Sequence, residues 1–229
     1  MDEAHRLKKK SAIFHGENQV KELINAGRVT VFFIDEDQKI TTKDIGSKDE
    51  IRKWAAFYGI PVYEGEDLNL VSQFRCNGSD GYLNFLDNLL GIRSTANLSF
   101  DYDYEIRLFR SPVKMREALR EKNNLNNKSR MIAGYCYEWV TESNPQGDEY
   151  DIILEDGFRA KWNFSNSLFA IAPDSFDQVG CIHTTQGLEF DYCGIIIGQD
   201  LRYEDGQVIT EPSKEAMSDK SSGIRSCKD

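Results

Sequence analysis

Short continuous runs of apolar residues recur along the chain, and each has the length of a β-strand. They lie at residues 29–34, 130–136, 179–182 and 191–198. A continuous run of β-branched and aromatic residues is typical of a strand buried on both faces of a parallel sheet. Shorter or alternating strand patterns lie at residues 68–71, 104–109 and 150–154, the last as part of a hairpin.

Between these runs, apolar residues recur at helical spacing. Helices are predicted over residues 18–26, 47–58, 80–90 and 112–122. Gly27 follows the first of these helices and Pro112 opens the last, as stop and start signals require. Because helices alternate with buried strands, the sequence predicts an α/β protein with mainly parallel sheets flanked by helices.

Composition supports a packed core, and charge limits the class of function. The chain has 229 residues, of which 40% are hydrophobic, enough for one large domain or two small ones. Its 28 basic and 38 acidic residues give a net charge of -10, which argues against a protein that coats nucleic acid through bulk charge. A local basic groove stays possible. The polar end of the chain, residues 218–229, is predicted to be a disordered tail.

The cysteines and the longest apolar run indicate in which cellular compartment the protein resides. Five cysteines, odd in number and without a C-x-x-C pair, support neither a zinc site nor a full disulfide framework. Reduced thiols fit the cytosol. The apolar run at 193–198 is far shorter than the roughly 20 residues of a membrane span. We therefore expect a cytoplasmic protein without a membrane partner.

Four short polar segments occur in one order along the chain. They are Asp2-Glu3-Ala4-His5 and the segments at 33–38, 73–78 and 183–191. Each has an ordinary alternative: the first could be a solvated helix start, acids at 35–37 could serve loop solubility, and Arg75 could form a surface salt bridge that contributes little. Their order and spacing together favour a shared function.

This set resembles the superfamily 1 helicases, and more closely the Schlafen group 3-like DNA/RNA helicase domains. The resemblance runs from Asp2 to about Leu201, and its strongest element is the stretch G-C-I-H-T-T-Q-G-L-E-F-D-Y at 180–192. Segments 73–82, 130–135 and 160–163 also carry it. The resemblance implies a RecA-like core of two α/β lobes that act on ATP and Mg²⁺ and move along single-stranded DNA or RNA.

The resemblance also implies catalytic roles. Asp2 would hold Mg²⁺ and Glu3 would activate the attacking water. Gln38 would sense the γ-phosphate, since its amide can donate to a phosphate oxygen. Arg75 would be the arginine finger, whose planar fork stabilises charge on the transferring phosphoryl group.

Further implied roles fall on the strongest segment. Gly187 and Glu189 would lie near the nucleotide ribose, and His183, Thr184 and Thr185 would contact nucleic acid. Two alternatives stay open: His183 could be a core histidine, and Gly187 could be a helix-entry glycine that needs positive φ.

Three aromatic residues have two interpretations as well. Trp139, Trp162 and Phe169 could stack on bases, as aromatics do in single-strand binders. Aromatic residues at strand ends more often belong to the core.

The sequence departs from the family pattern in two places. It contains no phosphate-binding loop of the form G-x-x-x-x-G-K-[ST], and the arginine-bearing motif expected after 198–200 is not recognisable. We therefore expect a fragment, with residues 1–66 as the remainder of a first lobe and 67–217 as a second lobe. Alone it should bind ATP weakly and not hydrolyse it. A complementary chain could supply the loop, or the protein could be a non-enzymatic nucleic-acid-binding or regulatory module.

Overall fold

The computed structural model describes residues 1–10, 14–70, 80–96, 104–163, 168–172, 174–219 and 222–224. The chain divides into two compact units. Unit 1 comprises Met1–Ser72 with Lys220–Asp229, and unit 2 comprises Gln73–Asp219. Among the described residues, no helix combines the length and apolar character that crossing a membrane would need.

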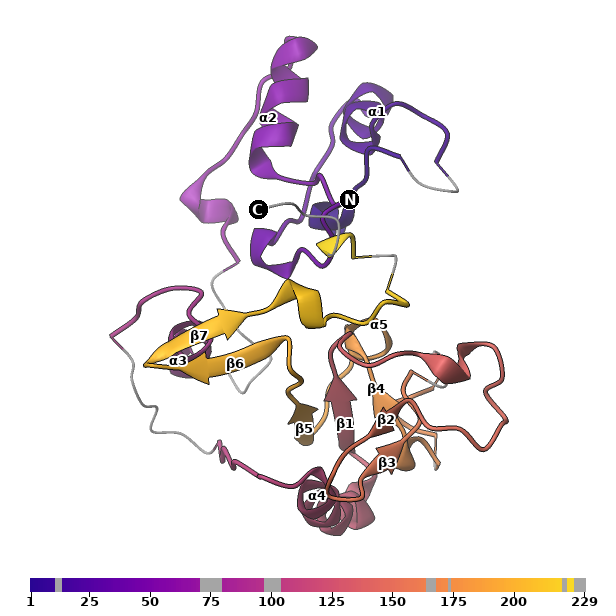
Figure 1. Cartoon of the computed structure of the whole chain (residues 1–229). Helices are drawn as coiled ribbons and strands as arrows, with labels where there is room; N and C mark the ends of the chain where they lie inside the picture. Colours follow the sequence, from indigo (N-terminus) through magenta and orange to yellow (C-terminus); the bar gives the residue numbers. More distant parts are fainter. Residues whose placement is uncertain are drawn as a thin grey trace. The chain divides into compact units, whose positions relative to one another are not determined.

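Unit 1 is built from helices and extended segments. Its helices are α1 (Gln19–Ala26) and α2 (Lys48–Phe57), with the three-residue 3₁₀ helices η1 (Ala4–Arg6), η2 (Glu36–Gln38) and η3 (Glu66–Leu68). Both predicted α-helices are confirmed (Figure 1). The Asn18 side chain caps α1 by accepting from the N–H groups of Val20 and Lys21, and Ser47 caps α2 by accepting from Glu50.

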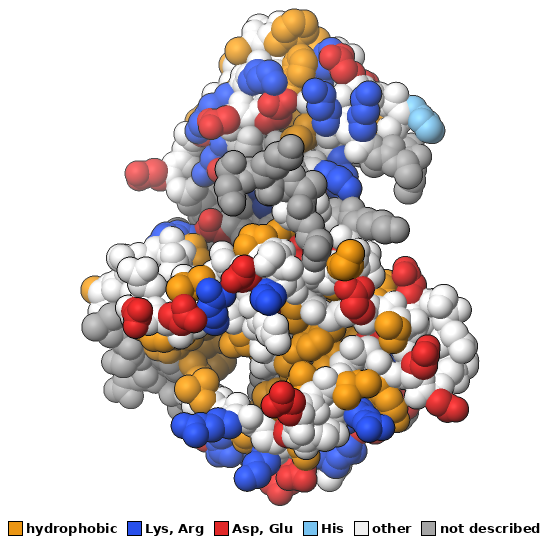
Figure 2. Space-filling view, viewed as in Figure 1, with side chains coloured by type: hydrophobic (Ala, Val, Ile, Leu, Met, Phe, Trp, Pro, Cys, Tyr) orange, Lys and Arg blue, Asp and Glu red, His pale blue; other side chains and the backbone are white. Residues whose placement is uncertain are grey.

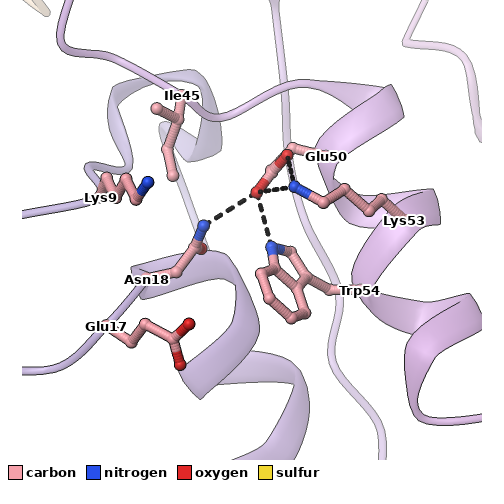
Figure 3. Close-up of a pocket in the computed structure, with 7 residues that line it drawn as sticks. All are labelled: Lys9, Glu17, Asn18, Ile45, Glu50, Lys53 and Trp54. Carbon is pink, nitrogen blue, oxygen red and sulfur yellow. Dashed lines mark hydrogen bonds and ion pairs between the residues drawn. The ribbon is translucent and has the colours of Figure 1, made fainter.

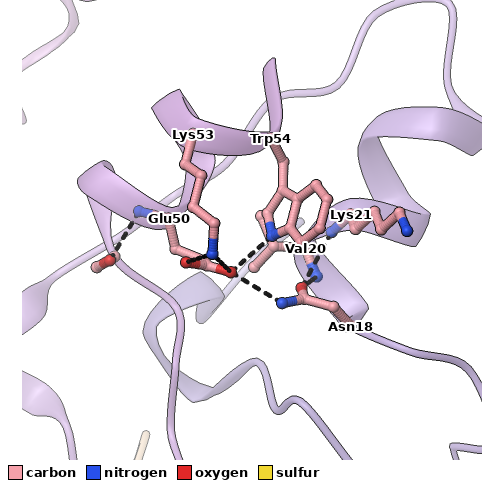
Figure 4. A network of polar contacts seen from close by, with 7 residues as sticks. Asn18, Val20, Lys21, Glu50, Lys53 and Trp54 are labelled. Atoms are coloured by element: carbon pink, nitrogen blue, oxygen red, sulfur yellow. Dashed lines mark hydrogen bonds and ion pairs between the residues drawn. The ribbon is translucent and has the colours of Figure 1, made fainter. Parts of the chain in front are cut away.

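One carboxylate ties the two helices of unit 1 together. Glu50 on α2 accepts from Asn18 Nδ2 at 2.8 Å and from Trp54 Nε1 at 2.6 Å, and Lys53 Nζ lies 3.1 Å from its other oxygen (Figure 4). Since the same Asn18 side chain caps α1, this network fixes the start of α1 against the first turns of α2.

The core of unit 1 gathers the N-terminal segment and both helices. Ala4, Leu7, Val20 and Ile24 are its buried residues, and partly buried side chains pack around them from Leu23, Phe32, Ile34, Ile51, Trp54 and Tyr58. The backbone of the first residues runs beside residues 31–33. Ala4 N–H donates to the Phe33 carbonyl and Phe33 N–H to the Met1 carbonyl, each at 2.9 Å.

The prediction of a strand at 29–34 buried on both faces is wrong. Val29, Val31 and Phe33 are 85%, 57% and 52% exposed, whereas Phe32 and Ile34 face the core. The backbone is extended, yet the described part of unit 1 contains no β-sheet. A run in which every residue is apolar does not distinguish burial on one face from burial on two. The expected strand at 68–71 is also not formed at Leu68, which ends η3.

Unit 2 contains the predicted parallel sheet. Strands β1 (Ser129–Ala133), β4 (Val179–Gly180) and β5 (Tyr192–Ile196) pair in the order β4-β1-β5, all parallel (Figure 1). Helix α4 (Pro112–Asn126) packs against β1 and β5, with Met115 and Leu119 close to Gly194. The three continuous apolar runs of this unit are therefore confirmed as strands of a mixed α/β fold.

Smaller elements complete unit 2. They are α3 (Asp80–Leu89), α5 (Ile182–Thr185), the antiparallel hairpins β2 (Ile152–Ile153) with β3 (Arg159–Ala160) and β6 (Leu201–Glu204) with β7 (Gln207–Thr210), and the 3₁₀ helices η5 (Val140–Glu142), η6 (Ser175–Asp177) and η7 (Pro212–Lys214). The helix at 80–90 and the hairpin strand near 150–154 are confirmed. The β6–β7 hairpin was not predicted, although Asp205-Gly206, both at positive φ, is a strong two-residue turn signal.

The strand predicted at 104–109 is wrong. This segment is not paired in a sheet, and Leu108 is 96% exposed. The alternation of apolar and polar residues in this segment does not place one face against a core. Such alternation alone therefore does not establish a strand. Helix α4, in contrast, extends beyond the predicted end to Asn126, where Asn127 adopts a left-handed conformation and donates its N–H to the Asn123 carbonyl.

A buried arginine holds the end of α4 in place. The Arg130 side chain on β1 is fully buried and donates to the carbonyls of Phe169 at 2.9 Å and Ala170 at 2.7 Å. It also donates to the side chains of Asn123 and Asn127, each at 3.0 Å. No carboxylate pairs with it among the described residues. Burial lowers the pKa of Arg130 from its usual value.

Candidate functional site

The first polar segment lies at the surface of unit 1 except for its histidine. Asp2 and Glu3 are exposed, whereas Ala4 and His5 are buried. Asp2 Oδ1 accepts from the Glu3 N–H at 3.0 Å, and Glu3 adopts a left-handed conformation with φ of 51°. This region costs a non-glycine residue free energy and is enriched at functional sites. The left-handed conformation of Glu3 presents the carboxylates of Asp2 and Glu3 on one exposed turn before η1.

His5 links this turn to the second polar segment. Its Nδ1 accepts from the Asp35 N–H at 3.4 Å, and its Nε2 lies 3.1 Å from the Glu3 carboxylate without hydrogen-bonding geometry. With only 2% of its surface exposed, the imidazole is held between the two segments. The structure therefore brings together Glu3 and Asp35, which the sequence separates by 32 positions.

Asp35 in turn holds Gln38. Asp35 Oδ1 accepts from the Asp37 N–H at 3.1 Å and begins η2, while its Oδ2 accepts from Gln38 Nε2 at 2.8 Å. Gln38 is exposed. The candidate residues Asp2, Glu3 and Gln38 thus belong to one connected surface of unit 1. Asp35, to which sequence analysis gave no role of its own, is the residue that joins Gln38 to His5.

The donor set is compatible with Mg²⁺ only in part. Among the described residues, no group of three or more His, Cys, Asp or Glu side chains is arranged to hold a metal ion. Mg²⁺ commonly binds one or two carboxylates together with water and substrate phosphates. One oxygen of the exposed Asp2 carboxylate accepts from the Glu3 N–H, and the other is available. Asp2 could therefore be a single carboxylate ligand of Mg²⁺ if phosphate oxygens complete the coordination. Arg75, the expected arginine finger, lies outside the described residues.

The first candidates of the fourth polar segment, at 183–191, lie where β4 ends and α5 begins. Thr184 is buried, and its hydroxyl accepts from the Cys181 N–H at 2.8 Å. The Thr185 hydroxyl donates to the Cys181 carbonyl at 2.9 Å and is half-buried. The Thr184 hydroxyl therefore holds the helix start, whereas His183 is exposed on the same short helix. The interpretation of His183 as a core histidine is wrong.

Gly187 and Glu189 follow α5. Gly187 has φ of 81°, in the region that favours glycine, and no other atom lies where its Cβ would stand. The alternative interpretation expected Gly187 to open a helix. It instead follows the end of α5. Glu189 is exposed two residues later. Both are accessible on the turn between α5 and β5.

A polar cluster that sequence analysis did not identify lies beneath His183. The Tyr135 hydroxyl is 3.7 Å from Cys181 Sγ, which donates to Asn163 Oδ1 at 3.4 Å. The Tyr135 and His183 rings make an edge contact with centroids 5.8 Å apart. Burial and the neighbouring Cys181 raise the pKa of Tyr135. Tyr135 and Cys181 both follow parallel strands, whose carboxyl ends meet at one edge, and this rule is the signal that could have found them.

The aromatic candidates for base stacking belong to the core. Trp162 and Phe169 are buried, and Trp139 is half-buried against Trp162, with ring centroids 5.9 Å apart. The core interpretation is confirmed for Trp162 and Phe169.

Burial, together with the Asp200 carboxylate, raises the pKa of Cys136 to about 12, so that this thiol stays protonated at neutral pH and is a poor nucleophile.

Comparison with known proteins assigns the family. Residues 1–228 match the family model described as Schlafen group 3, DNA/RNA helicase domain. The chain belongs to this Schlafen group 3 family. The resemblance expected from the sequence motifs is thereby confirmed, and membership indicates a helicase-related role.

A relative in yeast extends this comparison. The chain is 25% identical over 228 aligned residues to "Uncharacterized protein YPL245W" of Saccharomyces cerevisiae, and the alignment covers 89% of this chain and 49% of the yeast protein. The chain thus spans about half the length of this curated relative. No solved structure matches the chain.

Proposed function

We propose that the chain forms part of a RecA-like, ATP-dependent DNA/RNA helicase or translocase, with the phosphate-binding loop supplied by another segment or polypeptide. The observation that carries this proposal is the link through His5, which joins the Asp2-Glu3 turn to the Asp35–Gln38 segment. An ATPase needs its water-activating and phosphate-sensing groups to respond together, and in unit 1 His5 and Asp35 connect the two segments that would carry these groups.

The roles proposed for unit 1 follow from exposure and chemistry. Mg²⁺, when bound, would neutralise charge on the transferring phosphoryl group. Asp2 would hold this ion through its exposed carboxylate, and the Glu3 carboxylate would accept a hydrogen bond from the attacking water. Gln38 would donate from the amide that now bonds Asp35, so binding of a γ-phosphate would compete with the Asp35 contact.

The residues of unit 2 are proposed either to contact nucleic acid or nucleotide, or to hold the turn that carries these contacts. His183 and Thr185 would contact a single-stranded nucleic acid, and Thr184 would hold the turn that presents them. Glu189 would accept a ribose hydroxyl beside Gly187, and Arg75 keeps the arginine-finger role that the resemblance implies. We also propose a cytoplasmic location, which suits the free thiols of Cys136, Cys181 and Cys193.

The experiment combines two measurements on the purified chain. Anisotropy of labelled single-stranded DNA and RNA is expected to show binding that weakens with salt. ATP hydrolysis with Mg²⁺ is expected to be absent with or without the oligonucleotide. Failure to bind either strand at low salt would contradict the nucleic-acid role. Steady turnover that Glu3→Gln abolishes would contradict the need for a loop from elsewhere.

A second candidate function is a non-enzymatic nucleic-acid-binding module. It is favoured by the lack of a phosphate-binding loop in this sequence. The nucleotide sequence around the coding region distinguishes the two. Finding G-x-x-x-x-G-K-[ST] upstream in any frame supports the ATPase, and co-expression with that segment should then restore hydrolysis. If no such segment restores hydrolysis while single strands still bind, the module is the better description.

A further inference from the structure

Unit 1 contains a pocket that none of the proposed catalytic residues lines. It has a volume of roughly 260 Å³ and lies between Lys9, the residues Glu17 and Asn18, Ile45 and the first turns of α2 (Figure 3). Lys9 and Lys53 extend their ammonium groups toward it, and Trp54 forms part of its wall. The question is which ligand chemistry these groups would select.

The two carboxylates of the pocket are already compensated. Glu50 accepts from Asn18, Trp54 and Lys53. Glu17 forms an ion pair with Lys21, and that bond, with a smaller effect of the Lys9 charge, holds the pKa of Glu17 below its usual value. Both acids therefore stay ionised and paired at neutral pH.

Lys9 carries the charge that is left over. No hydrogen bond or ion pair joins its ammonium group to another described residue, and it acts on Glu17 only through space. Glu17 is paired with Lys21, which lies outside the pocket lining, and Glu50 is paired with Lys53. Lys9 is therefore the one lining ammonium group without an ion-pair partner among the described residues.

A single unpaired ammonium group beside two carboxylates selects among anions. A phosphodiester carries a single negative charge and matches it. A free triphosphate carries several charges, which the Glu17 and Glu50 carboxylates would repel. Lysine binds phosphate as a compact point charge and needs no fixed fork geometry. The pocket chemistry therefore favours a phosphate within a strand over a free nucleotide.

The surroundings of the pocket extend this preference. Arg6 and Lys10, in the same basic run as Lys9, are exposed. Figure 2 shows several Lys and Arg side chains on the viewed face of the part formed by α1 and α2, interspersed with Asp and Glu side chains. Exposed basic side chains at one place on a protein whose net charge is -10 allow local binding of a strand without coating of the whole surface.

We propose that this pocket binds a phosphate of single-stranded nucleic acid, with Lys9 as its principal contact. The inference rests on the proposed nucleic-acid function and adds a contact on unit 1 to those at the β4–α5 turn. Trp54, whose ring lies 4.9 Å from Lys21 Nζ and 5.0 Å from Lys53 Nζ, keeps these two cations beside the pocket.

The test compares Lys9→Gln with Lys48→Gln in the full chain, using labelled oligo(dT) and its RNA counterpart. Lys48 is an exposed lysine of the same unit that does not line the pocket. We expect Lys9→Gln to weaken binding about three- to tenfold and to lower the slope of log K against log salt by about 0.7, as loss of one phosphate contact on a single strand requires. Lys48→Gln should bind like the wild type, and Lys9→Arg should restore most of the affinity.

Each outcome separates this inference from the function on which it rests. If the wild type binds and Lys9→Gln binds equally well with the same slope, the pocket assignment is overturned and the nucleic-acid function stands. If the wild type binds no strand, both fail. Inorganic phosphate or ATP, added against chloride at matched ionic strength, should not displace the strand; displacement would show a free-phosphate site instead. Unchanged melting of the variants confirms that they fold.

Discussion

The backbone N–H of Asp35 donates to the Nδ1 atom of His5 across 3.4 Å, although the two residues stand 30 positions apart in the sequence. Because His5 is buried and Asp35 is exposed, this contact passes from the core of unit 1 to its surface. It constrains the backbone that carries Gln38 by means of a residue beside Glu3. A perturbation at one segment should therefore reach the other.

His5→Ala removes this link. We expect a loss of about 1–3 kcal/mol in unfolding free energy, because a buried ring and a hydrogen bond disappear together. Amide exchange at Asp35 should accelerate more than exchange within α2. The exposed His15, replaced by Ala, is the matched control. Equal protection of the Asp35 amide in the wild type and in His5→Ala would contradict the proposed link.

Glu50→Gln should make the stability of unit 1 less dependent on acid. Burial alone raises the pKa of Glu50, but hydrogen bonds from Trp54, Lys53 and Asn18 outweigh it and hold the pKa below its ordinary value of 4.5. A depressed carboxyl pKa stabilises the fold above the unfolded pKa, and the contribution disappears as pH falls through the folded pKa.

The measurement for Glu50 is urea unfolding at a series of pH values. Above pH 4.5 the wild type should exceed Glu50→Gln by about 1 kcal/mol, and the difference should shrink steadily as the solution becomes more acid. Glu66→Gln, at an exposed site of η3, serves as the control for the loss of an acidic side chain outside the network. A difference that is constant with pH would argue against the network.

Substitutions at two neighbouring residues of α5 should distinguish a role in stability from a role in nucleic-acid binding. Thr184→Val removes the hydroxyl that accepts from Cys181, and we expect a loss of about 1 kcal/mol in stability. His183→Ala, on the exposed side, should leave the melting temperature unchanged and weaken single-strand binding several-fold. If His183→Ala destabilises the fold as much as Thr184→Val, the contact role of His183 is wrong.

Arg130→Met should be among the most destabilising changes in unit 2. It leaves the carbonyls of Phe169 and Ala170 without their donor in a buried site, and we expect a loss of about 3 kcal/mol or more. Arg130→Lys should recover little, since an ammonium cannot reproduce the planar fork. Arg110→Met, at an exposed position, is the control. Denaturant unfolding followed by circular dichroism decides the comparison.

The parallel sheet could be predicted because its pattern is local. The runs that became β1, β4 and β5 are short, apolar and flanked by polar residues, and helix α1 has Asn18 before it and Gly27 after it. These signals need no knowledge of distant partners. They gave the parallel sheet and the α/β character of unit 2 correctly.

The errors share one physical cause, which is that burial depends on residues far away in the sequence. Nothing within 29–34 shows that Val29 and Val31 face solvent while Phe32 packs against the buried cluster of unit 1. The candidate site follows the same rule. Motif order placed Glu3 and Gln38 in one function, but the link through His5 and Asp35 depends on tertiary packing, as does the contact of Tyr135 with Cys181.

The positions of the tryptophans give each unit its own optical reporter. Trp162 is 1% exposed in the core of unit 2, whereas Trp54 lies half-buried on α2 of unit 1. Indole emission shifts to shorter wavelength in an apolar setting, so variants that keep only Trp54 or only Trp162 should emit at different wavelengths. Thermal scans of the two variants would then reveal whether the units unfold as one cooperative body or as two independent ones, a distinction that decides how far a stability change in one unit reports on the other.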